Sequence, residues 1–152
     1  MAYWLFKTEP DTFSIDDLLT KQVSCWEGVR NYQARNMMRD EMKLGDLVLL
    51  YHSSCKHIGA VGIGKVVKES YPDHFQFDEQ SDYYDPKASE ENPRWWMVDI
   101  EFVAKFDKRV SLAKMKSMPE LADMPLVKRG NRLSIMPVTE QQWQAITSLG
   151  QS

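Results

Sequence analysis

The sequence WEGVRNYQARN, residues 26–36, places an aromatic ring, a glycine turn and several planar hydrogen-bond donors within a few positions of one another. The indole of Trp26 can stack on a flat ring, while Asn31 and Arg30 can read the edge of such a ring or hold a phosphate. The stretch therefore predicts a site for a planar, polar ligand. A plainer reading is also open, in which Trp26 fills the core, Asn31 caps a helix and Arg30 is a surface cation.

Outward from this stretch, strand patterns dominate the middle of the chain and helix signals flank them. Runs of apolar or β-branched residues predict strands at 3–6, 47–51, 58–67, 94–106 and 133–138. Capping residues predict helices that begin after Ser14, Asn31, Ser111 and Thr139. This pattern predicts an α+β fold. Gly62 and Gly64 share one face of a strand, which favours a small curved sheet that closes into a barrel of about five to six strands.

The composition predicts one domain over residues 1–152, because 152 residues with 43% hydrophobic content suffice for one core. The polar stretch from Asp78 to Pro93 is expected to pass over a site rather than to divide domains. The hydrophobic pattern begins at Tyr3, and no apolar run approaches the ~20 residues of a membrane span, so we expect neither a signal peptide nor a membrane contact. Two cysteines favour a reduced compartment, hence a cytoplasmic or nucleoid-associated protein.

The net charge of −3, from 22 acidic and 19 basic residues, limits the way in which this chain can bind a polyanion. A general nucleic-acid coat would carry a broad basic face. A binder in which a few cations meet a few phosphates is compatible with the charge. Specificity would then have to come from a pocket.

Two long stretches and six short ones resemble a known family in the same order. Residues 3–10, YWLFKTEP, and residues 26–36 closely resemble the signature of the EVE domain, a PUA-like domain related to the YTH and ASCH domains. The shorter pieces are Leu44-Gly45-Asp46, Tyr51-His52-Ser53, Tyr71-Pro72-Asp73, Tyr84-Asp85-Pro86, Arg94-Trp95-Trp96 and Arg132-Leu133-Ser134. The resemblance runs from about Ala2 to about Leu149. It implies a non-enzymatic reader of a modified base, with a flipped modified cytosine in DNA favoured.

The resemblance also implies roles for particular residues. Trp26 would be the stacking platform, the backbone of Gly28 and Val29 and the side chain of Asn31 would read the ring edge, Ser53 would add a hydrogen bond and Trp95 a second apolar wall. The expected phosphate or nucleic-acid contacts are Lys7, Arg30, Arg35 and Arg132. The expected rim residues are Thr8, His52 and Tyr84, and tyrosines including Tyr83 could stack on neighbouring bases.

Other chemistry is not favoured by the residues. His52, Cys55 and His57 resemble half of a zinc site, but a structural zinc usually takes four protein ligands, so we expect no metal and no cofactor. No acid–base pair stands out, since Glu9, Glu27 and His52 are candidates only by position. The alternatives are a YTH-like reader of methylated adenine in RNA and an ASCH-like nucleic-acid-processing enzyme. We expect a monomer that binds nucleic acid.

Magnitudes limit the selectivity that such a pocket can reach. Flipping a base costs a few kcal/mol of stacking and pairing, and stacking on Trp26 returns ~1–3 kcal/mol. Burial of a methyl group adds only about 0.8 kcal/mol, which gives several-fold discrimination. Sharp selectivity would need a polar handle, such as a hydroxymethyl group or a ring edge matched by Asn31.

Overall fold

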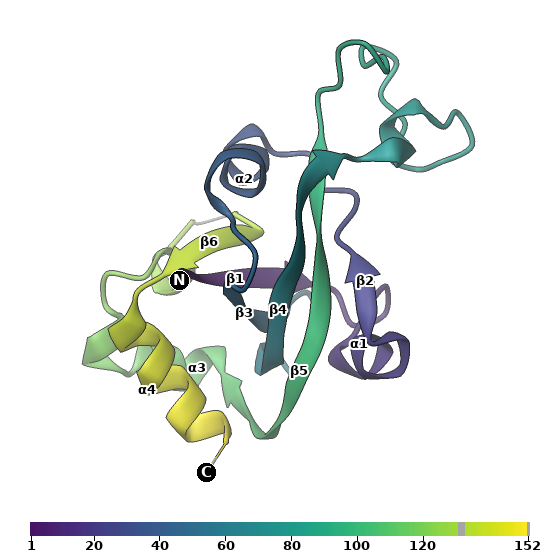
Figure 1. Ribbon diagram of the computed structural model, residues 1–152. Coiled ribbons are helices and arrows are strands. Elements are labelled where there is room, and N and C mark those ends of the chain that lie inside the picture. Colours follow the sequence, from purple (N-terminus) through teal and green to yellow (C-terminus); the bar gives the residue numbers. More distant parts are fainter. Residues whose placement is uncertain (131–132, 152) are drawn as a thin grey trace.

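One mixed sheet of six strands lies at the centre of the protein, in the order β2-β5-β4-β3-β1-β6 (Figure 1). The computed structural model describes residues 1–130 and 133–151. β1 pairs with β3 in parallel, and the other strand pairs are antiparallel. The strands are β1 (Tyr3–Thr8), β2 (Val23–Cys25), β3 (Leu47–His52), β4 (Gly59–Pro72), β5 (Trp96–Ser111) and β6 (Ile135–Val138).

Helices flank the sheet and begin where the sequence places their caps. Ser14 and Thr139 form capping boxes, while the side chains of Asn31 and Ser111 accept hydrogen bonds from the backbone of the first turn. The helices are α1 (Ile15–Lys21), α2 (Tyr32–Asn36), which continues into the π-helical turn η1 (Met37–Glu41), α3 (Leu112–Lys116) and α4 (Glu140–Gly150). Short 3-10 turns are η2 (His74–Phe77), η3 (Pro119–Leu121) and η4 (Pro125–Val127). The predicted α+β class is confirmed.

The sheet is buried on both faces, so the buried hydrophobic residues form two clusters rather than one. On β1, Trp4 and Phe6 belong to the cluster that includes residues of α1 and α2, whereas Leu5 belongs to the cluster that includes residues of α3 and α4. This separation follows from the alternation of side chains along a strand. Trp143 of α4 lies in the second cluster and stacks on the ring of Tyr3 at 4.7 Å.

Gly62 and Gly64 lie where other groups approach β4 closely. A Cβ atom at Gly62 would lie 2.6 Å from the carbonyl oxygen of Ala104 and 2.6 Å from Cδ1 of Ile15, and one at Gly64 would lie 2.5 Å from Cγ2 of Ile100. The β4–β5 register shifts at several points, and such irregularities bend a hairpin. A carbonyl oxygen of β5 and side chains of α1 and β5 therefore occupy the space that side chains at these two positions would need.

The predicted closure into a barrel is not found among the described residues. The sheet is open, with β2 and β6 at its two ends and no pairing between them. β2 has three residues and pairs with β5 alone, and β6 has four and pairs with β1 alone. Edge strands this short leave the curved sheet without the ladder that would join its ends.

A long excursion, residues 73–95, rises from the ends of β4 and β5 at the top of the view in Figure 1. It contains the polar stretch from Asp78 to Pro93 that the sequence places over a site. Two fully buried polar side chains, Asp73 and Gln76, lie at its base. Among the helices of residues 1–130 and 133–151, none is long and apolar enough to cross a membrane.

Candidate functional site

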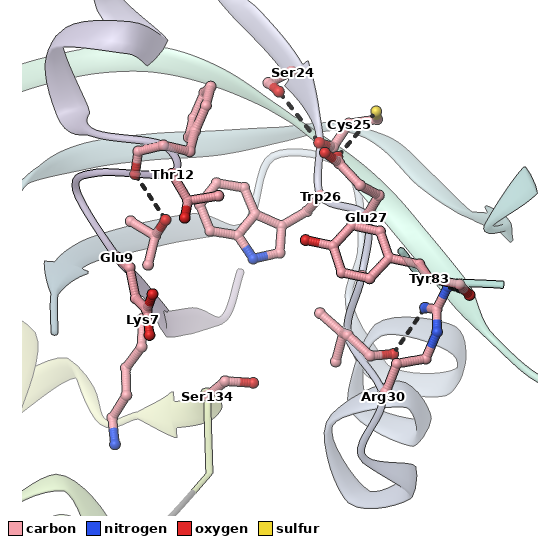
Figure 2. Close-up of a pocket in the computed structure, with 14 residues that line it drawn as sticks. Lys7, Glu9, Thr12, Ser24, Cys25, Trp26, Glu27, Arg30, Tyr83 and Ser134 are labelled. Atoms are coloured by element: carbon pink, nitrogen blue, oxygen red, sulfur yellow. Dashed lines mark hydrogen bonds between the residues drawn. The ribbon is translucent and has the colours of Figure 1, made fainter. Parts of the chain in front are cut away.

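A cavity of about 290 Å³ opens between the end of β1, the turn that follows β2, and the 73–95 excursion. Figure 2 shows the indole of Trp26 near its centre, with Lys7 and Glu9 on one side and Tyr83 and Arg30 on the other. The lining residues are Lys7, Thr8, Glu9, Thr12, Phe13, Ser24, Cys25, Trp26, Glu27, Gly28, Val29, Arg30, Tyr83 and Ser134.

Trp26 forms a rigid wall of this cavity. Its backbone N–H donates to the carbonyl of Val98 at 2.9 Å, which fixes the residue at the end of β2. The indole packs on Phe6 at 5.2 Å and meets the ring of Phe13 edge-on at 5.8 Å. These contacts leave Trp26 8% exposed, yet it still lines the cavity. An indole supported in this way loses little freedom when a ring stacks on it.

Tyr83 and Phe13, rather than Trp95, supply the other aromatic rings at the cavity. The phenol reaches in from the excursion toward Trp26 (Figure 2). Gly28 makes this approach possible, because a Cβ atom there would lie 2.5 Å from the tyrosine ring. Gly28 also has a φ of +83°, a conformation that favours glycine. Arg30 holds the segment by donating from Nη2 to the carbonyl of Tyr83 at 2.8 Å.

Asp73 ties the excursion to the turn after β2. Its Oδ2 accepts from the backbone N–H of Gly28 at 2.9 Å and from Nη1 of Arg30 at 3.0 Å, while its Oδ1 accepts from the N–H of Phe75. Gln76 holds the other end of the excursion, because its side chain bonds the backbone N–H and the carbonyl of Trp95. The position of Tyr83 therefore depends on two buried polar side chains.

The polar groups of the cavity carry both signs of charge. Burial lowers the pKa of Lys7, whose ammonium makes no ion pair among the described residues. Glu9 and Glu27 bring carboxylates to the same space. A ring with both donors and acceptors on its edge would find partners there.

The nucleophile candidates in and near the cavity are not activated. Burial, with Glu27 adding to the effect, raises the pKa of Cys25 to about 11. Its thiol is therefore neutral near pH 7 and a poor nucleophile. His52 does not line the cavity, since its Nε2 accepts from the backbone N–H of Ile15 at 3.1 Å, and burial lowers its pKa. No group of three or more metal-ligating side chains occurs in the part of the chain that the structure describes.

The structure brings six of the predicted site residues to the cavity and leaves six others outside its lining. Those that line it are Lys7, Thr8, Trp26, Gly28, Val29 and Arg30, although the N–H of Gly28 is already taken by Asp73. Those that do not are Asn31, Arg35, His52, Ser53, Tyr84 and Trp95. Arg132 lies outside the described residues.

Three of the residues outside the lining have local partners that account for their positions. The side-chain oxygen of Asn31 accepts a hydrogen bond from the backbone N–H of Ala34, so Asn31 acts as the cap of its helix. Trp95 stacks on Tyr32 at 4.9 Å and donates from Nε1 to Asp85 at 2.8 Å. The backbone N–H of Ser53 donates to the carbonyl of Thr8 at 3.0 Å, which places Ser53 behind the β1 wall.

Other lining residues had weaker signals in the sequence. Tyr83 stands in the polar stretch expected over a site, but only as a partner for neighbouring bases. Glu9 and Glu27 belong to the two long family signatures and were candidates by position alone. Asp73, which organises the site from behind, belongs to the short Tyr71-Pro72-Asp73 piece. The further lining residues without an expected role are Thr12, Phe13, Ser24, Cys25 and Ser134.

Substitution of Gly28 by alanine tests the contact between the turn and Tyr83. We expect Gly28→Ala to lose about 1–2 kcal/mol of unfolding free energy, because alanine is strained at positive φ. The new methyl group also displaces the Tyr83 ring from the cavity wall. Gly45→Ala is the matched control, since Gly45 has a φ of +88° and no atom within 4 Å of the added Cβ. Denaturant unfolding should give similar losses for both variants, and cavity binding should fall only in Gly28→Ala. Equal cavity binding by the Gly28→Ala and Gly45→Ala variants would contradict a role for Tyr83 in the cavity wall.

The fold and the cavity define a small α+β domain with an aromatic-lined pocket of about 290 Å³. Comparison with known proteins identifies the family to which this domain belongs. The chain belongs to the EVE domain family, whose model matches residues 2–149. Human thymocyte nuclear protein 1 is 44% identical over 167 residues, a match that covers 97% of this chain and 73% of the relative. The resemblance found in the sequence is confirmed.

Solved structures extend the comparison. A protein from Pseudomonas syringae is 50% identical and superposes with a TM-score of 0.94, covering 97% of this chain and 99% of that one. Human THYN1, solved in complex with DNA that contains 5-methylcytosine, is 43% identical with a TM-score of 0.94, covering 100% and 99%. An ASCH protein variant from Zymomonas mobilis has a TM-score of 0.54 at 8% identity, covering 98% and 99%, which shows a likeness of fold alone.

Proposed function

We propose that this protein is a reader of modified cytosine in DNA, and that the base binds in the cavity between Trp26 and Tyr83. The observation that carries the proposal is this aromatic-walled cavity of about 290 Å³ in a chain that shares its fold with human THYN1, which was solved with DNA containing 5-methylcytosine. That volume is close to the lower end, about 300 Å³, of pockets that bind small molecules. A single flipped base can be accommodated in a volume of this size.

The walls and the edge of the cavity have separate tasks in this proposal. Trp26 stacks on the face of the flipped base and Tyr83 covers it from the excursion. A cytosine edge offers an amino group and two acceptors. Lys7 donates to an acceptor on one side of the ring, and the carboxylate of Glu27, whose Oε2 accepts from the Cys25 thiol at 3.4 Å, also accepts from the amino group on the other. Edge reading by Asn31 is not included, because that side chain caps α2.

The expected selectivity is modest for a methyl group. Base flipping costs a few kcal/mol, and stacking on Trp26 and Tyr83 returns ~1–3 kcal/mol per aromatic contact. The methyl group itself contributes about 0.8 kcal/mol, a several-fold preference. A hydroxymethyl group that reaches Glu9 or Glu27 would be selected more strongly, because a polar site rejects a ligand that leaves it unpaired.

Binding to matched DNA duplexes tests the proposal. The duplexes differ at one position, which carries cytosine, 5-methylcytosine or 5-hydroxymethylcytosine, and affinity is measured by fluorescence anisotropy over a salt series. We expect tighter binding of a modified duplex, with a slope of log affinity against log salt near −3, the value for about three phosphate contacts. Equal affinity for all three duplexes would refute the reader function. A slope near −8 would show that the protein contacts many more than three phosphates, which would contradict the expectation of a few contacts.

The same experiment also tests the two alternatives, a reader of methylated adenine in RNA and a nucleic-acid-processing enzyme. An RNA oligonucleotide with N6-methyladenine competes against the modified DNA, and stronger competition by the RNA would replace the DNA proposal. Mass spectrometry of the nucleic acid after incubation tests for turnover, and we expect the base and the backbone to be unchanged. The sequence predicts a cytoplasmic or a nucleoid-associated protein. A DNA target favours the nucleoid-associated location.

A further inference from the structure

A cluster of arginines and aromatic rings, which includes the expected phosphate contact Arg35, lies next to the cavity but outside its lining. Tyr32 of α2 and Trp95 of the excursion stack at 4.9 Å with an interplanar angle of 24°. The guanidinium carbon of Arg35 lies 4.7 Å from the centre of the Tyr32 ring, and that of Arg94 lies 5.7 Å from it. Arg39 lies over the neighbouring Trp96 at 5.4 Å. We call Tyr32, Arg35, Arg39, Arg94, Trp95 and Trp96 the arginine–aromatic surface, although Trp95 itself is buried beside Tyr32.

The carboxylates around this surface leave part of its charge uncompensated. Asp85 lies 3.4 Å from Arg94 and also accepts from Trp95, and Asp40 pairs with Arg39 at 2.8 Å. The third nearby acid, Asp73, is fully buried and pairs with Arg30. Arg35 makes no ion pair within the described ranges.

Neutral acceptors fix Arg35 in place instead. Its Nη1 donates to the carbonyl of Arg94 at 2.9 Å, and its Nε and Nη2 donate to the side-chain oxygen of Asn36 at 3.1 and 2.8 Å. Burial lowers the pKa of Arg35, and the charge of Arg39 lowers it further. The guanidinium is thus oriented and half-buried near like charges, an arrangement that an added anion would stabilise.

A purely structural role accounts for only part of this arrangement. Stacked arginines can fasten α2 to the excursion, and the bond from Arg35 to the Arg94 carbonyl does so. Fastening alone does not require Arg35, Arg39 and Arg94 to gather on one side of a chain whose net charge is −3. The ring of Tyr32 contacts the guanidinium groups of Arg35 and Arg94. Tyr32 is 47% exposed, so the surface is open to a ligand.

Arg30 connects this surface to the cavity. It lines the cavity beside Tyr83, and its guanidinium carbon lies 5.4 Å from the centre of the Trp95 ring. α2 lies beside the ends of β4 and β5 from which the excursion rises (Figure 1). A strand that delivers a base past Arg30 into the cavity therefore has its backbone within reach of Arg35 and Arg94.

We propose that the arginine–aromatic surface binds the phosphodiester backbone of the DNA strand whose base occupies the cavity, with Arg35 and Arg94 as its principal phosphate contacts. The inference rests on the proposed function and adds the path of the strand to it. Guanidinium groups hold phosphates with paired N–H donors, and stacking on Tyr32 and Trp95 orients these donors in advance.

The experiment measures Arg35→Ala and Arg94→Ala against the modified and unmodified duplexes over a salt series. Each variant should bind both duplexes roughly three- to tenfold more weakly, and its salt slope should be smaller by about one unit, because one phosphate contact is lost. The ratio of the two affinities should stay at the wild-type value. Arg109→Ala is the matched control, since Arg109 also donates to a backbone carbonyl, that of Ile58, but lies at the far end of β5. It should bind as the wild type does.

The outcomes separate this inference from the proposed function. Wild-type affinity and slope in both arginine variants, while the wild type still prefers modified DNA, would overturn the inference alone. The inference would also be overturned if the arginine variants lost the preference for modified over unmodified DNA and kept the wild-type salt slope. The arginines would then act by shaping the cavity and not by binding phosphate. A wild type without any preference would refute the proposed function, and a reduced slope in the variants would still support the phosphate surface.

Discussion

Trp26→Ala should abolish the preference for modified DNA and lower the unfolding free energy by about 3–5 kcal/mol. The two effects have one cause, because the indole is 8% exposed, packs on Phe6 and Phe13 and still lines the cavity. Loss of the stacking platform corresponds to ~1–3 kcal/mol of binding, or about a 5- to 150-fold loss of affinity for the modified duplex. Denaturant unfolding and anisotropy on the same preparation give both numbers.

The control for this variant is a second buried tryptophan. Trp143 is 5% exposed, stacks on Tyr3 and belongs to the cluster on the other face of the sheet. Trp143→Ala should lose comparable stability and keep the preference, provided that both proteins are assayed below their unfolding transitions. Trp26→Phe should keep much of the packing and part of the preference. A folded Trp26→Ala protein with wild-type preference would exclude Trp26 from base binding.

Asp73→Ala should lower the unfolding free energy by about 3 kcal/mol and also weaken cavity binding. The substitution leaves the N–H of Gly28 and the guanidinium of Arg30 without the carboxylate that binds both. The loss falls at the lower end of the range for buried ion pairs, because the Arg30 side chain is 23% exposed and water can solvate it. Binding weakens because Tyr83 loses its anchorage to the turn.

Two comparisons sharpen the Asp73 experiment. Asp46 is also buried and accepts from the N–H of Ala2 and the indole of Trp4, so Asp46→Ala should destabilise the fold without affecting the cavity. The double variant Arg30→Ala/Asp73→Ala should be less destabilised than the sum of the two single variants. Additive losses would show that the two side chains do not stabilise each other.

Local patterns in the sequence predicted much of the fold and one side of the cavity. Caps at Ser14, Asn31 and Thr139 depend on a few consecutive residues, and each was found where expected. The strands are also local patterns, although β4 and β5 run further than predicted, to Pro72 and Ser111. Whether the sheet closes depends on the lengths of both edge strands, and composition does not specify those lengths.

The other side of the cavity depends on contacts between distant segments. Arg30 bonds Asp73 and Tyr83, which lie 43 and 53 positions away in the sequence. No local periodicity encodes such pairs. The resemblance led us to expect Trp95 in the cavity wall, but Trp95 precedes β5, which begins at Trp96, and it stacks on Tyr32 outside the cavity lining.

The excursion over the cavity is attached through side-chain hydrogen bonds and through the stacking of the buried Trp95 on Tyr32. Neither core cluster includes a residue of 73–95 in the described chain, and the excursion adds no strand to the sheet. We therefore expect that residues 78–93 can be exchanged or shortened while Asp73, Gln76 and both clusters keep their positions. The size of ligand that this scaffold admits can thus be re-engineered, or diversified by natural variation, separately from its capacity to fold.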